Sequence, residues 1–118
     1  MAREKFGTLT EPMFYVLLCL RSERCGMDIM DRVKRVTEER VVIGPGTLYH
    51  LLDDFAGEGM IVETRSEGRK RYYRITEKGM WMLELEYQRI LQMAADYEQW
   101  KDGTYEKNEE GTEPVFIF

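Results

Sequence analysis

Apolar residues recur at helical spacing in the segment that begins at Pro45 and ends near Gly57 and Gly59. Pro45 suits the first turn of a helix, because its missing N–H would have no partner there. Polar and aromatic side chains lie off the apolar stripe, so the pattern predicts a short helix with a packed back and an exposed front. The stripe itself, at i, i+3, i+4 and i+7, consists of Leu48, Leu51, Leu52 and Phe55.

Two more helices are predicted before this segment. Thr10–Pro12 is a helix start, with a Thr cap, an acid and an early proline. The run Met13–Leu20 that follows is apolar on all faces, which is typical of a helix buried on more than one side. After Gly26, a second helix is expected from about Met27 to Thr37. Its inward residues are Ile29, Met30 and Val33.

Two segments after residue 59 have the alternation and the β-branched and aromatic residues of strands. They are Met60–Arg65 and Arg71–Thr76, and the connection Ser66–Lys70 contains a glycine for the turn of a hairpin. Thr76 and Glu77 then cap a last helix, from about Glu77 to Lys101. The side chains of the two strands expected in the core are Ile61, Tyr73 and Ile75.

The order of these elements predicts a mostly α fold with a small β-hairpin. Three helices followed by a hairpin form the winged helix-turn-helix arrangement, in which the third helix enters the DNA major groove and the hairpin wing touches the flanking backbone. We expect a loose arm at 1–9, the winged helix-turn-helix at 10–76, a long C-terminal helix at 77–102 and an acidic tail at 103–118. The apolar end of that tail, Val115–Phe118, is expected to dock on the body or on a partner subunit.

Charge is distributed unevenly along the chain. The net charge is −5, but residues 1–78 have 14 Lys and Arg against 13 Asp and Glu, whereas residues 79–118 have 3 against 9. The first two thirds could therefore face an anion such as DNA, while the last third faces water or another subunit.

Cysteine usage and hydropathy point to a cytoplasmic protein. Cys19 and Cys25 have no histidine nearby and suggest neither a metal site nor a disulfide framework, which fits a reducing compartment. The longest apolar run, Met13–Leu20, is far shorter than the roughly 18 residues of a membrane span. No signal peptide or membrane partner is expected.

Several short motifs share a family likeness. They are Gly46-Thr47-Leu48-Tyr49, then Leu51-Leu52, then Glu58-Gly59-Met60-Ile61, then the run from Gly68 to Gly79 with the sequence GRKRYYRITEKG. Together they resemble the PadR family of bacterial transcriptional regulators, over about residues 10–95. The resemblance implies a dimer in which the winged helix-turn-helix reads DNA and the C-terminal helices join the subunits.

The single long C-terminal helix is similar to that of the short-chain branch of the family. Some members of that branch repress multidrug-transporter genes and bind flat aromatic compounds between subunits, where a tryptophan on this helix clamps the ligand. Ile90 occupies that place in this chain, so no ligand site is carried over. Trp81, Tyr87 and Trp100 could line a pocket for a small aromatic effector at the dimer interface, or they could be ordinary interface packing.

DNA contacts are expected at two places. Hydroxyl and imidazole groups at the start of the third helix can bond base edges or phosphates; the alternative is a polar face that touches nothing. The dense basic run of the hairpin can neutralise phosphates; the alternative is a solvated hairpin kept soluble by charge. The predicted DNA-binding residues are Thr47, Tyr49, His50, Arg69, Lys70, Arg71, Tyr72 and Arg74.

A seam of apolar residues with the spacing 3, 4, 3, 4, 3 runs along the last helix. Such an a/d pattern is typical of a helix that meets a partner helix. The alternative is packing on the winged helix of the same chain, but the seam is longer than a body of this size can cover. The predicted dimer-interface residues are Met80, Leu83, Tyr87, Ile90, Ala94 and Tyr97.

Enzyme chemistry is not expected. His50 is the single histidine, and neither a Gly-rich phosphate loop nor a convincing carboxylate pair is present. The sequence therefore predicts no cofactor and no metal. It predicts a dimeric repressor that binds double-stranded DNA at a pseudo-palindromic operator. The alternative is a winged-helix protein–protein interaction module that does not bind DNA.

Overall fold

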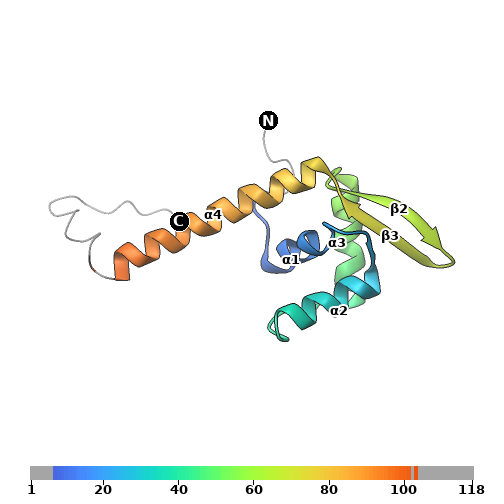
Figure 1. Ribbon diagram of the computed structural model, residues 1–118, viewed down its shortest axis with the longest axis horizontal. Coiled ribbons are helices and arrows are strands. Elements are labelled where there is room, and N and C mark those ends of the chain that lie inside the picture. Colours follow the sequence, from blue (N-terminus) through green and yellow to red (C-terminus); the bar gives the residue numbers. More distant parts are fainter. Residues whose placement is uncertain (1–6, 102, 104–118) are drawn as a thin grey trace. The chain divides into compact units, whose positions relative to one another are not determined.

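The computed structural model describes residues 7–101 and 103, and Figure 1 shows their helices and strands in chain order. The described residues form two compact units, which divide between Glu86 and Tyr87. The expected tail segment Val115–Phe118 and residues 1–6 of the expected arm lie outside the described residues.

The first two helices are α1 (Glu11–Cys19) and α2 (Gly26–Val36). The cap predicted for α1 is confirmed, because the Met13 amide donates to Oγ1 of Thr10 at 3.4 Å. Both helices bury one side in the core of the first unit. Their fully enclosed side chains are Val16, Leu17, Ile29 and Val33.

Helix α3 (Pro45–Gly57) has the predicted start, end and buried side. Leu48, Leu52 and Phe55 are buried, and Leu51 is partly buried against the same core. The chain leaves α3 through Gly59, whose φ of +76° lies in the left-handed region that glycine adopts without strain. The apolar stripe therefore fixes which side of α3 faces solvent.

The sheet has three antiparallel strands in the order β1-β3-β2, one more than predicted. Strand β1 (Arg24–Cys25) pairs with β3 (Lys70–Ile75), which also pairs with β2 (Ile61–Glu67). A two-residue strand is too short to show any alternation, which is why the pattern missed β1. In Figure 1 the hairpin of β2 and β3 projects away from α1, α2 and α3 of the same unit.

The hairpin turn is tighter than the predicted loop Ser66–Lys70. Both strands continue to the turn, which consists of Gly68 and Arg69, with Gly68 at φ +60°. The hairpin side chains expected in the core, Ile61, Tyr73 and Ile75, are buried as predicted.

Helix α4 (Glu77–Lys101) has the predicted bounds. Its cap is confirmed, since the Gly79 amide donates to Oγ1 of Thr76 at 3.1 Å and that hydroxyl donates to the Gly59 carbonyl at 2.7 Å. Met82 and Leu83 are buried in the core of the first unit. The prediction that Leu83 belongs to a dimer seam is therefore wrong, because the winged-helix body of its own chain covers it.

The described end of the N-terminal arm is not loose. Leu9 is buried, and its amide donates a 3.0 Å hydrogen bond to the carboxylate of Glu86, which is also buried. The expectation of a loose arm up to residue 9 is wrong at this residue, because both its side chain and its amide have partners in the body.

Candidate nucleic-acid interface

The exposed side of α3 has the polar residues that the sequence placed there. Thr47, Tyr49 and His50 are all exposed, opposite the buried Leu48 and Leu52. The helix begins after Gly44 without a side-chain cap, and its first turn contains no acidic residue. The amides of the first turn are therefore available to an external anion.

Tyr49 is anchored as well as exposed. Its side chain crosses to the first residue of α2, and a β-carbon placed on Gly26 would lie 2.5 Å from the Tyr49 hydroxyl oxygen. The residue still has 47% of its surface exposed. Tyr49 therefore packs between α2 and α3 while nearly half of its surface stays exposed to solvent.

His50 lies one turn before an acid on the same helix. Its Nε2 is 3.5 Å from a carboxylate oxygen of Asp54, and 78% of the imidazole side chain is exposed. The helix contains no lysine or arginine. Positive charge for DNA must therefore come from other elements, and α3 itself offers hydroxyls, one imidazole and backbone amides.

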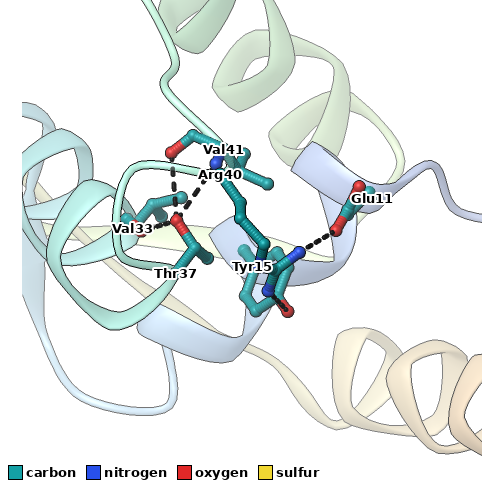
Figure 2. Close-up of polar contacts among 6 residues, drawn as sticks. All are labelled: Glu11, Tyr15, Val33, Thr37, Arg40 and Val41. Atoms are coloured by element: carbon teal, nitrogen blue, oxygen red, sulfur yellow. Dashed lines mark hydrogen bonds and ion pairs between the residues drawn. The ribbon is translucent and has the colours of Figure 1, made fainter.

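The turn that leads into α3 is held by one buried hydroxyl (Figure 2). Thr37 is buried, its Oγ1 donates to the Val33 carbonyl at 2.7 Å, and it accepts from the Val41 amide at 3.1 Å. Glu38 and Glu39 have φ of +52° and +66°, an uncommon conformation for residues other than glycine. The Thr37 hydroxyl thus stabilises a strained turn in the connection between α2 and α3.

Arg40 ties the same turn to α1, as Figure 2 also shows. Its guanidinium donates to the Tyr15 hydroxyl at 3.3 Å and to the Glu11 carboxylate at 3.1 Å. These two hydrogen bonds raise the pKa of Arg40 above its ordinary value, and the bond to Tyr15 has the larger effect. The pair is exposed, so it orients the turn more than it stabilises the fold.

The basic residues of the hairpin do not share one face. Arg69 lies in the turn, and Lys70, Arg71 and Arg74 are exposed on β3. Side chains of a strand alternate, so Lys70 and Arg74 lie on one face while Arg71 lies on the face of the buried Tyr73. The hairpin therefore offers positive charge on both faces and at its tip, which suits contact with phosphates on either side.

Tyr72 is covered by an arginine that the sequence reasoning missed. The Arg65 guanidinium lies 3.8 Å from the centre of the Tyr72 ring. A bulge at Thr64 places Arg65 opposite Tyr72 instead of opposite Arg71. Because spacing alone does not reveal a bulge, no sequence signal pointed to this contact, and Tyr72 is less available to DNA than the basic residues beside it.

Two carboxylates hold Arg65 in this place. Its Nη1 is 2.9 Å from Glu67 and its Nε is 3.3 Å from Glu23, whose other oxygen accepts a bond from the Thr64 hydroxyl. The pKa of Glu23 lies below its ordinary value. The hydrogen bond from Thr64 is the largest cause, and the contacts with Arg65 add to it. Arg65 is therefore largely neutralised within the protein.

A small open hollow of about 180 Å³ lies on the surface of the first unit. Its lining includes Tyr15, Leu18, Cys19 and Val36, with Arg24 and Arg32 beside them. Burial raises the pKa of the Cys19 thiol, partly offset by the two arginines, so this thiol is protonated at neutral pH. Among the described residues, no group of three His, Cys, Asp or Glu side chains could hold a metal ion.

Helix α4 has large apolar side chains in solvent. Of the predicted seam, Met80, Tyr87, Ile90, Ala94 and Tyr97 are exposed, whereas Leu83 is buried. Two further residues of this helix are exposed although they fall off the 3-4 spacing of the predicted seam. These are Leu91 and Met93.

Fold and site together define a winged helix-turn-helix DNA-binding protein. The sequence model of the transcriptional regulator PadR-like family matches residues 16–85, which is more than half of the chain. The chain belongs to this family and is a DNA-binding transcriptional regulator. No curated protein sequence matches it significantly. In the part of the chain that the structure describes, no helix has both the length and the apolar character of a membrane span.

Three solved structures show the same fold at low identity. A transcriptional regulator from Clostridium thermocellum is 23% identical, with a TM-score of 0.55, over 81% of this chain and 90% of its own. A PadR family transcriptional regulator from Eggerthella lenta is 23% identical, with a TM-score of 0.52, over 82% of this chain and 80% of its own. A complex structure of RosR, a protein of H. salinarum, is 21% identical, with a TM-score of 0.62, over 89% and 96%.

Proposed function

We propose that α3 lies in the major groove of duplex DNA and that the hairpin of β2 and β3 is a wing on the flanking backbone. The observation that supports this best is the exposed front of α3, where Thr47, Tyr49 and His50 lie opposite the buried Leu48 and Leu52. Hydroxyl and imidazole groups bond base edges or phosphates in such positions. Thr47, Tyr49 and His50 then contact the groove and its borders.

The wing supplies affinity that does not depend on sequence. Arg69, Lys70, Arg71 and Arg74 are exposed and form no salt bridge among the described residues, in contrast to Arg65. Each phosphate that such a residue neutralises releases counterions, so binding weakens as salt rises. Tyr72 has a smaller part in this proposal because the Arg65 guanidinium covers its ring.

The regulator acts as a dimer joined through the C-terminal helix, with residues 10–76 as the DNA-binding domain and 77–102 as the dimerisation helix. Tyr87, Ile90 and Tyr97 leave large apolar side chains in solvent on one helix, which is unusual for a surface that has no partner. Two-fold symmetry of the protein then matches a pseudo-palindromic operator, and occupancy of that operator blocks transcription in the cytoplasm.

A small aromatic effector between the subunits is part of the same proposal. Trp81 and Trp100 are about half exposed and could stack on a flat ligand. Such a ligand would act by changing the spacing of the two wings through the C-terminal helices.

Selection of bound sequences from a pool of random duplexes tests the proposal. The full chain is incubated with the pool at moderate salt, and bound duplexes are recovered, amplified and sequenced over several rounds. We expect enrichment of an inverted repeat whose half-sites lie about one helical turn apart. A pool that stays random while the protein is folded would contradict the proposal.

A further inference from the structure

The first residue of α2 is a glycine that lies under the ring of Tyr49. Gly26 is buried, and a β-carbon built on it would lie 2.5 Å from the Tyr49 hydroxyl oxygen, 2.8 Å from Cζ and 3.0 Å from Cε1. A real β-carbon does not come within 3.0 Å of non-bonded atoms of another residue. The far end of the tyrosine therefore occupies the space that any other residue at position 26 would need.

The backbone does not explain this glycine. Positive φ values among the described glycines occur at Gly59, Gly68 and Gly103, and Gly26 is not one of them. A residue with a side chain could adopt the same backbone, and alanine is a better helix former than glycine. The reason for glycine at position 26 is thus the space it leaves for Tyr49.

The contact restricts a side chain that is otherwise free to turn. Tyr49 is 47% exposed, and its hydroxyl has no hydrogen-bond partner among the described residues. The ring bridges α3 and α2, so its position depends on the surface of α2 and not only on its own helix. A side chain that is already held in its binding position loses less conformational entropy when it contacts DNA.

We propose that Gly26 is a positioning residue for DNA binding, because it lets the Tyr49 ring rest on the start of α2 and so sets the direction of the hydroxyl. The inference rests on the proposed role of α3 in the major groove. A side chain at position 26 pushes the ring outward, where it no longer meets DNA in the same place. The ring is the far end of a flexible side chain, so it yields and the fold remains.

A double-mutant cycle on DNA affinity tests the inference. Four full-length proteins, the wild type, Gly26→Ala, Tyr49→Ala and the double variant, are titrated by fluorescence anisotropy against the duplex that the wild type selects. We expect each single variant to bind about tenfold more weakly, the loss of about one hydrogen bond. In the Tyr49→Ala background, Gly26→Ala should cause no further loss, because no ring remains to be displaced.

Two further measurements separate positioning from a general effect on the fold. Gly57→Ala is the matched control, because Gly57 is also helical and a β-carbon there meets nothing within 4 Å. Its affinity should equal that of the wild type. The salt dependence of Gly26→Ala should also be unchanged, because the tyrosine hydroxyl is neutral and its displacement releases no counterions.

The outcomes distinguish this inference from the proposed function. If the wild type selects no duplex, both are wrong. If the wild type and Tyr49→Ala behave as expected but Gly26→Ala binds normally, or if the two losses add in the double variant, only the positioning role is wrong. A Gly26→Ala protein that does not fold would also overturn it, because Gly26 would then serve the fold and not the direction of Tyr49.

Discussion

A β-carbon on Gly79 would lie 2.2 Å from the carbonyl oxygen of Met60. The same carbonyl accepts the Thr76 amide at 2.9 Å, so the first turn of α4 lies directly against the connection between α3 and β2. Ile75 crowds the position from the other side, with Cγ1 at 2.6 Å from the same β-carbon. The glycine that ends the GRKRYYRITEKG run is thus required by a close backbone approach within the first unit.

Gly79→Ala should therefore destabilise the protein. The added methyl group meets backbone, which cannot swing away as a side chain can, so we expect a loss of about 1–3 kcal/mol in the free energy of unfolding. Urea unfolding followed by circular dichroism measures it. Gly57→Ala is the control and should be neutral or slightly stabilising, because its β-carbon has open space. Equal stability of the two variants would show that α4 does not lie against Met60 as described.

The carboxylate of Glu23 should make stability depend on acid pH. Its pKa is lowered by the Thr64 hydroxyl bond and by Arg65, so the folded protein holds this proton less tightly than the unfolded chain does. The stabilisation that ionised Glu23 gives the fold is present above the pKa of this carboxyl in the unfolded chain, near 4.5. It is lost as the pH falls through the lower pKa of Glu23 in the folded protein. The stability difference between wild type and Glu23→Gln should shrink between pH 5 and pH 3, roughly the range in which carboxylates titrate. A difference that stays constant across that range would show that Glu23 does not titrate as an ion-paired group.

Wing variants should lose affinity for all DNA sequences alike. Arg69→Ala and Arg71→Ala should each lower the slope of log affinity against log salt by about one, if each residue meets one phosphate. Lys101→Ala makes the same change in charge at the end of α4 and should leave the slope unaltered. Unchanged slopes in both arginine variants would remove the wing from the interface.

The proposed dimer seam can be tested at its centre. Ile90→Glu would place a charge among apolar side chains of the partner, at a cost of several kcal/mol unless the interface opens. We expect a monomer at micromolar concentration by analytical ultracentrifugation, and a steep loss of DNA binding because one half-site contact remains. Glu84→Gln, on the exposed side of the same helix, should stay dimeric. An Ile90→Glu protein that remains a dimer would move the interface elsewhere.

Patterns that depend on one element could be predicted from the sequence. The stripe of Leu48, Leu52 and Phe55 determined the buried side of α3, and the caps at Thr10 and Thr76 marked two helix starts. These features depend on local spacing and on short-range hydrogen bonds. The exposed front of α3 followed directly from the stripe.

Features that need two distant segments could not be predicted in this way. Strand β1 exists only because β3 pairs with Arg24 and Cys25, and Arg65 reaches Tyr72 only because of a bulge. The apolar spacing also placed Leu83 correctly on the last helix. It could not show that Leu83 is buried against the body of its own chain. The contact of Gly26 with Tyr49 belongs to the same class, because nothing in the sequence joins residues so far apart.

The most direct test of sequence recognition by α3 compares two duplexes and two proteins in one anisotropy experiment. The wild type and Tyr49→Ala are titrated against the selected duplex and against a shuffled duplex of equal composition, at one fixed salt concentration. The wild type should prefer the selected duplex by about a thousandfold or more, as specific regulators do. Tyr49→Ala should bind the selected duplex about tenfold more weakly, and so lose about tenfold of that preference, while it binds the shuffled duplex nearly as before. Equal binding of both duplexes by the wild type would contradict sequence recognition by α3.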